Sequence, residues 1–156
     1  MDEAEGIRRG TRIWIVKNVA SVFIFGALAF AAAGRLDWTM AWVFVAVMAV
    51  NVVVTLAVIG RRSPGLLAER SGLKADTKPW DPPLAILTAC GPLLVTIAAG
   101  LDRRFGWTRP PGFGVSLAML APVLAGWALA DWAMASNRFF AATVRIQADR
   151  GHEVVS

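Results

Sequence analysis

Few polar residues lie inside or beside the long apolar stretches of this sequence, where their side chains could bind or react. We single out Lys17, Asn18, Asn51, Thr88, Cys90, Thr96 and Asp131. Ionisable groups in apolar stretches are costly, so each suggests either a functional site or a paired charge. Lys17 and Asp131 lie about one helical turn from the ends of their stretches, which predicts a structural ion pair between them. Asn51 is predicted to hydrogen bond with a neighbouring helix, and Cys90, the single cysteine, to be a buried thiol.

No common catalytic or metal-binding motif accompanies these residues. The glycines form no phosphate-binding loop, no cysteine and histidine spacing is typical of a metal site, and no nucleophile elbow is present. The sequence therefore predicts no metal and identifies no catalytic residue. Two polar segments, 61–82 and 136–156, are the remaining places for chemistry.

The first polar segment reads Arg-Ser-Pro-Gly-Leu-Leu-Ala-Glu-Arg at 62–70 and Thr-Lys-Pro-Trp-Asp at 77–81. A proline after Ser63 predicts a short helix that begins at Pro64. Leu66, Leu67 and Leu73 are predicted to lie on the membrane side of this helix, at the bilayer interface.

The second polar segment carries three short patterns in a row. They are Asn-Arg-Phe-Phe at 137–140, Arg-Ile-Gln at 145–147 and Asp-Arg-Gly-His at 149–152, and an apolar pair follows at 154–155. The segment is predicted to continue the preceding apolar helix to about Gly151.

Together, these patterns resemble the isoprenylcysteine carboxyl methyltransferase family, in its bacterial branch of S-adenosylmethionine-dependent membrane enzymes. The resemblance covers nearly the whole chain and implies methyl transfer from S-adenosylmethionine to a lipophilic acceptor. It implies that Gln147, His152 and Val154 contact the cofactor. Arg138 and Arg145 are candidates to orient an anionic acceptor, and binding of lipid phosphate or a role in topology is the alternative for both. The family continues with a Gly-Pro-Tyr-Arg-x-Val-Arg-His-Pro-x-Tyr motif, which this sequence lacks. The resemblance therefore implies an N-terminal part that supplies the membrane scaffold and one rim of the cofactor site, and that is inactive alone.

A four-helix membrane scaffold or interaction protein without catalysis is the second interpretation of the same residues. The two interpretations differ in whether the polar segments contact a cofactor. The sequence leaves open both the acceptor and the oligomeric state.

Four apolar windows must position these polar segments. Hydrophobic residues make up 56% of the chain and charged residues only 17%, a share well below that of soluble domains. The windows are about 13–33, 40–59, 83–101 and 115–135, and each is long enough to cross a bilayer as a helix. The sequence predicts an all-α, multi-pass protein with residues 1–156 in a single membrane domain. A signal peptide is the alternative for the first window, although its apolar run exceeds the usual length.

The basic residues predict the orientation of these helices. Of the 16 Lys and Arg residues, all but Arg35, Arg103, Arg104 and Arg109 fall on the side of the two polar segments. Basic residues are retained in the cytoplasm, so both termini and the loop 61–82 are predicted to be cytoplasmic, most simply at a bacterial inner membrane. The net charge of +5 is then attributed to topology and membrane lipid, and no nucleic acid partner is predicted.

The fourth window carries a stripe of small residues at every fourth position. The stripe consists of Ala118, Pro122, Gly126 and Ala130. Small residues permit close helix packing, so the stripe is predicted to face another span of the same chain, and a second copy of the chain is the alternative.

Overall fold

The computed structural model describes residues 3–71, 81–137 and 140 of this protein. The described residues form helices joined by turns, without a strand. In chain order the helices are α1 (Glu3–Ala33), α2 (Thr39–Arg62), α3 (Pro64–Glu69), α4 (Asp81–Phe105), α5 (Phe113–Ala118) and α6 (Leu120–Ser136).

The predicted apolar windows all lie within these helices, and most of the helices are longer than the windows. The first window lies in α1, the second in α2, the third in α4, and the fourth spans α5 and α6. α1 begins at Glu3, well before the apolar window, because polar turns also satisfy their own backbone hydrogen bonds. α6 ends at Ser136, and the extended backbone of Asn137 contradicts the prediction that the helix continues without a break.

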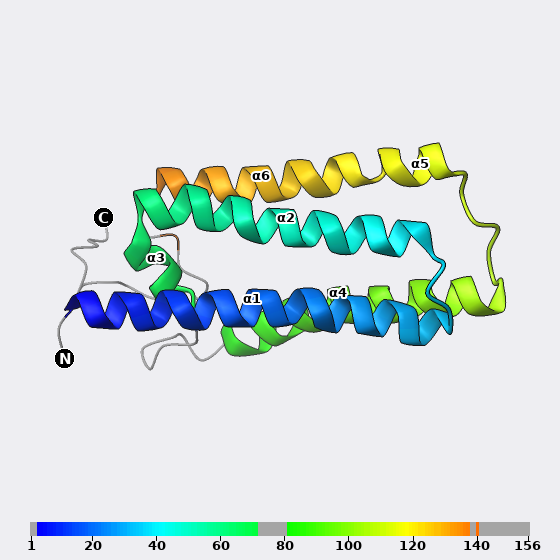
Figure 1. The fold of residues 1–156 in the computed structure, drawn as a ribbon, viewed down its shortest axis with the longest axis horizontal. Coiled ribbons are helices and arrows are strands. Elements are labelled where there is room, and N and C mark those ends of the chain that lie inside the picture. Colours follow the sequence, from blue (N-terminus) through cyan, green and yellow to red (C-terminus); the bar gives the residue numbers. More distant parts are fainter. Residues whose placement is uncertain (1–2, 72–80, 138–139, 141–156) are drawn as a thin grey trace.

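The long helices run side by side along the longest axis of the molecule (Figure 1). α4 packs on α1, α1 packs on α2, and α2 packs on α6. The short helix α3 lies at one end, between α1 and α2, where α6 also ends. We call this the α3 end. The turns from α1 to α2 and from α4 to α5 lie at the other end, which we call the opposite end.

Large apolar side chains point outward from the long helices. Phe23, Val95 and Trp132 remain 73%, 68% and 67% exposed. Such a surface suits contact with lipid, and the four spans Ala4–Ala33, Thr39–Arg62, Pro83–Phe105 and Phe113–Ser136 are long and apolar enough to cross a membrane. The predicted fold class, an all-α multi-pass membrane protein with four transmembrane helices, is confirmed.

A proline interrupts the fourth span. Pro122 has no N–H to donate to the carbonyl of Ala118, four residues earlier, and the helix breaks at Met119 between α5 and α6. The stripe of small residues around this break does not pack as predicted. Its four members are exposed, and a Cβ atom added to Gly126 would meet nothing within 4 Å.

Candidate functional site at the α3 end

The residues that the sequence proposes for the cofactor and acceptor lie outside the described part of the chain. Gln147, His152, Val154, Arg138 and Arg145 belong to this group. The structure does describe most of the first polar segment, together with Asn137 and Phe140 of the second. These residues define where the two segments approach each other.

The short helix α3 begins at Pro64 after Ser63, as predicted, and its leucines are buried against protein. Leu66 and Leu67 are fully buried in a cluster with Trp14, Ile59 and Met134, from α1, α2 and α6. Both leucines therefore pack against the ends of three spans and have no surface left for lipid. A helix that lies between two spans satisfies its apolar side chains against protein, which the pattern of a single segment does not reveal. Leu73 lies outside the described residues.

Close contact with α1 allows α3 to take this place. A Cβ atom added to Gly10 would lie 2.5 Å from the Cβ atom of Ala68 and 2.7 Å from its Cα atom. Only glycine fits at this crossing without a shift of one helix. The sequence analysis did not single out Gly10, because its role depends on a partner fifty-eight residues away.

Arg70, directly after α3, joins the two polar segments. Its Nη1 donates to the carbonyl oxygen of Phe140 at 3.4 Å, and its Cζ atom lies 5.4 Å from the centroid of the Phe140 ring. Burial lowers the pKa of the Arg70 guanidinium, whereas the negative charge of Asp131 acts to raise it. Residues from the two patterns 62–70 and 137–140 therefore meet at the α3 end, next to a buried carboxylate.

Asp131 and Lys17 have different partners, so the predicted ion pair between them is wrong. The hydroxyl of Thr55 donates to Oδ1 of Asp131 at 2.9 Å, within a buried contact between α2 and α6. Lys17 Nζ donates instead to the carbonyl oxygen of Ser71, at 2.5 Å. The sequence analysis omitted Thr55, although it lies four residues after Asn51 and therefore near the same face of α2.

Several other polar residues of the spans form side-chain hydrogen bonds within their own helices. Asn18 Nδ2 donates to the carbonyl oxygen of Trp14, and the hydroxyls of Thr88 and Thr96 donate to carbonyl oxygens four residues earlier. Cys90 is exposed on α4, which corrects the prediction of a buried thiol. These residues therefore give no indication of a site.

An apolar groove runs between α2 and α6 toward the same end of the molecule. It encloses about 400 Å³, and its lining includes Val47, Asn51, Val54, Leu124, Trp127 and Asp131. Asn51 lines this groove near the middle of α2, and Asp131 lines it near the end of α6. The groove thus combines an apolar wall with two polar groups, the usual composition of a small-molecule site.

Comparison with protein-family models, curated proteins and solved structures gives no match for this chain. The residue patterns of the two polar segments and the contact of Arg70 with Phe140 at the α3 end are therefore the features that indicate a function.

Proposed function

We propose that the chain provides the membrane scaffold and one rim of the cofactor site in an S-adenosylmethionine-dependent membrane methyltransferase. The contact between Arg70 and Phe140 is the observation that supports this proposal most. These residues come from separate patterns that resemble the same family, and they meet although 70 positions separate them. Phe140 remains 37% exposed, so part of this contact is open to a ligand.

The rim in this proposal consists of Gln147, His152 and Val154. S-adenosylmethionine would supply an electrophilic methyl group bound to a good leaving group, so the protein has little acid or base chemistry to perform. Positioning is then the main task of the residues. Arg70 would hold the 137–140 pattern, and with it the start of the segment that carries the rim, against the end of the spans.

The groove between α2 and α6 is the proposed path for the lipophilic acceptor. Its apolar wall suits an alkyl or isoprenoid chain, and it extends toward the Thr55 and Asp131 pair near Arg70. In this proposal Arg138 and Arg145 orient an anionic group of the acceptor. The chain is proposed to lie in the cell membrane, with the α3 end in the cytoplasm where S-adenosylmethionine is available.

Saturation-transfer NMR with S-adenosylmethionine tests this proposal on the full chain in nanodiscs, because the method detects weak binding. A single rim leaves much of the ligand in water, so we expect affinity near the millimolar range. The signal should be displaced by S-adenosylhomocysteine and reduced in His152→Ala and Arg70→Gln. Arg61→Gln, an exposed arginine at the end of α2, is the matched control and should keep the signal.

Two results would contradict the proposal in different ways. Signals that S-adenosylhomocysteine does not displace, equal in all variants, would favour the non-catalytic scaffold. Saturable micromolar binding would show that the chain forms more than one rim of the site.

A further inference from the structure

A second pocket lies at the opposite end of the molecule, far from the proposed cofactor rim. It encloses about 370 Å³ between the start of α2, the end of α4 and the start of α5. Its lining includes Asp37, Trp38, Asp102, Arg103, Phe113 and Ser116. Because the spans end here, the pocket lies at the depth of lipid headgroups in a bilayer.

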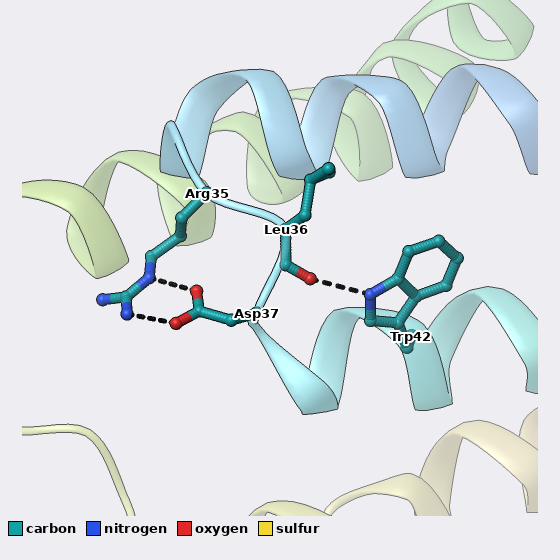
Figure 2. A network of polar contacts seen from close by, with 4 residues as sticks. All are labelled: Arg35, Leu36, Asp37 and Trp42. Atoms are coloured by element: carbon teal, nitrogen blue, oxygen red, sulfur yellow. Dashed lines mark hydrogen bonds and ion pairs between the residues drawn. The ribbon is translucent and has the colours of Figure 1, made fainter.

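Local contacts hold the walls of this pocket in place. Gly34 ends α1 with a φ of 66°, and the Arg35 guanidinium then donates two hydrogen bonds to the Asp37 carboxylate (Figure 2). Figure 2 also shows Trp42 Nε1 donating to the Leu36 carbonyl oxygen, at 2.8 Å. The turn that carries Asp37 into the pocket is therefore fixed from both sides.

The second acidic wall is fixed in a similar way. Asp102 accepts hydrogen bonds from the backbone N–H of Thr108 at 2.7 Å and from its hydroxyl at 2.9 Å. These bonds tie the end of α4 to the turn that leads to α5. Asp102 thus keeps its position at the pocket without a basic partner in either bond.

The charges at the pocket are incompletely matched within the described residues. The Arg103 Nε atom is buried and has no hydrogen-bond partner in the described part of the chain. A buried N–H without a partner costs free energy, which an anionic ligand would recover. The hydrogen bonds from Arg35 lower the pKa of Asp37, so this carboxylate is ionised at neutral pH. Among the residues that the structure describes, the pocket therefore combines the unpartnered Arg103 Nε with two carboxylates, of which Asp37 is paired with Arg35 and Asp102 is bound only by the neutral Thr108.

An apolar slot adjoins the polar pocket. It encloses about 210 Å³ between α1, α2 and α4, and it shares Trp38, Met40 and Ala99 with the polar pocket. Phe44 and Val95 line its deeper part. A ligand that occupies both spaces must have a charged head and an apolar tail.

We propose that this pocket binds a phospholipid with a primary ammonium headgroup, of the phosphatidylethanolamine type. The lipid phosphate accepts a hydrogen bond from Arg103, the ammonium group lies against Asp37 and Asp102, and the start of one acyl chain enters the slot. A headgroup with no cation leaves Asp102 without a cationic partner, because both of its hydrogen bonds within the described residues come from the neutral Thr108. A quaternary ammonium cannot donate hydrogen bonds to either carboxylate. This inference does not depend on the methyltransferase proposal.

Native mass spectrometry of the full chain in detergent, with three lipids of identical acyl chains, tests this site. We expect phosphatidylethanolamine to bind more tightly than phosphatidylcholine or phosphatidylglycerol. Arg103→Gln should weaken phosphatidylethanolamine binding roughly tenfold or more, since it removes a charged hydrogen bond. Asp102→Asn keeps an acceptor for Thr108 but should reduce the preference for phosphatidylethanolamine over phosphatidylglycerol.

Arg109→Gln is the matched control. Arg109 is an exposed arginine between α4 and α5, and it does not line the pocket. This variant should bind the three lipids as the unaltered chain does. Circular dichroism of each variant should give the helical signal of the unaltered chain. Equal binding of the three lipids, or equal losses in Arg103→Gln and Arg109→Gln, would overturn the proposal.

Discussion

The hydrogen bond between Thr55 and Asp131 is the buried polar contact that joins α2 to α6. Thr55 is 5% exposed and Asp131 is 9% exposed. A buried carboxylate needs donors, and the Thr55 hydroxyl supplies one at 2.9 Å. The charge of Asp131 in turn acts on Arg70, where it raises the pKa of the guanidinium against the effect of burial. Asp131 therefore links the packing of two spans to the segment that carries Arg70.

Replacement of Thr55 by valine tests this contact at nearly constant shape. We expect Thr55→Val to lower the free energy of unfolding by about 1–2 kcal/mol, because Asp131 loses a donor. Thr88→Val is the control, since its hydroxyl bonds only within α4 and is exposed. In denaturant unfolding in micelles, Thr55→Val and Asp131→Asn should be non-additive, whereas Lys17→Met and Asp131→Asn should be additive. Additive effects of the first pair would contradict the contact.

At the scale of elements, the packing of α4 on α1 depends on one glycine. A Cβ atom added to Gly100 would lie 2.6 Å from the Cβ atom of Ala32 and 2.9 Å from the carbonyl oxygen of Ala29. Because the carbonyl oxygen of Ala29 belongs to the backbone of α1, a change of side-chain rotamer cannot remove this steric clash. Gly91, on the same helix, has nothing within 4 Å of an added Cβ atom.

We therefore expect Gly100→Ala to destabilise the protein and Gly91→Ala not to destabilise it. Gly100→Ala should lower the free energy of unfolding by about 1–3 kcal/mol, the usual cost of overpacking. Gly91→Ala should be neutral or slightly stabilising, since alanine favours helix. Thermal unfolding of both variants in detergent, followed by circular dichroism, measures the difference. Equal thermal stability of the two variants would show that α4 does not pack on α1 at Gly100.

The four spans could be predicted from the sequence because hydropathy acts locally, along one segment. The contacts between them could not, because each depends on a partner far along the chain. The stripe around Gly126 shows this limit: small residues permit packing, but they do not specify that a neighbour is present. The break at Met119 could have been predicted from the sequence, because Pro122 has no backbone N–H to donate to the carbonyl oxygen of Ala118.

The candidate site could be predicted only in part, for the same reason. The residue patterns indicated that the two polar segments belong together, and Arg70 and Phe140 do meet. The role of Thr55 could not be predicted, because it depends on a carboxylate 76 positions away, whereas the hydroxyl of Thr88 bonds within its own helix. The burial of Leu66 and Leu67 could not be predicted either, because it depends on residues of three neighbouring spans.

At the scale of the whole molecule, the long helices lie side by side in the order α4, α1, α2, α6. Their length keeps the two polar ends of the molecule apart. Arg70 and Phe140 meet at the α3 end, and the opposite end carries the proposed lipid pocket. Apolar side chains cover the helices between these ends. Both proposals therefore rest on four crossings of the bilayer, and the cofactor proposal also requires a cytoplasmic α3 end.

Mapping of the topology by reporter fusions in cells tests this claim most directly. Fusions after Ala33 and Gly106 place the reporter at the opposite end. A fusion after Ser71 places it within the first polar segment, and a fusion after Ser156 places it at the end of the second. The distribution of basic residues predicts that the first two reporters are outside and the last two are in the cytoplasm. A cytoplasmic reporter after Gly106 would contradict the four-span arrangement, and an external reporter after Ser71 would exclude the proposed access to S-adenosylmethionine.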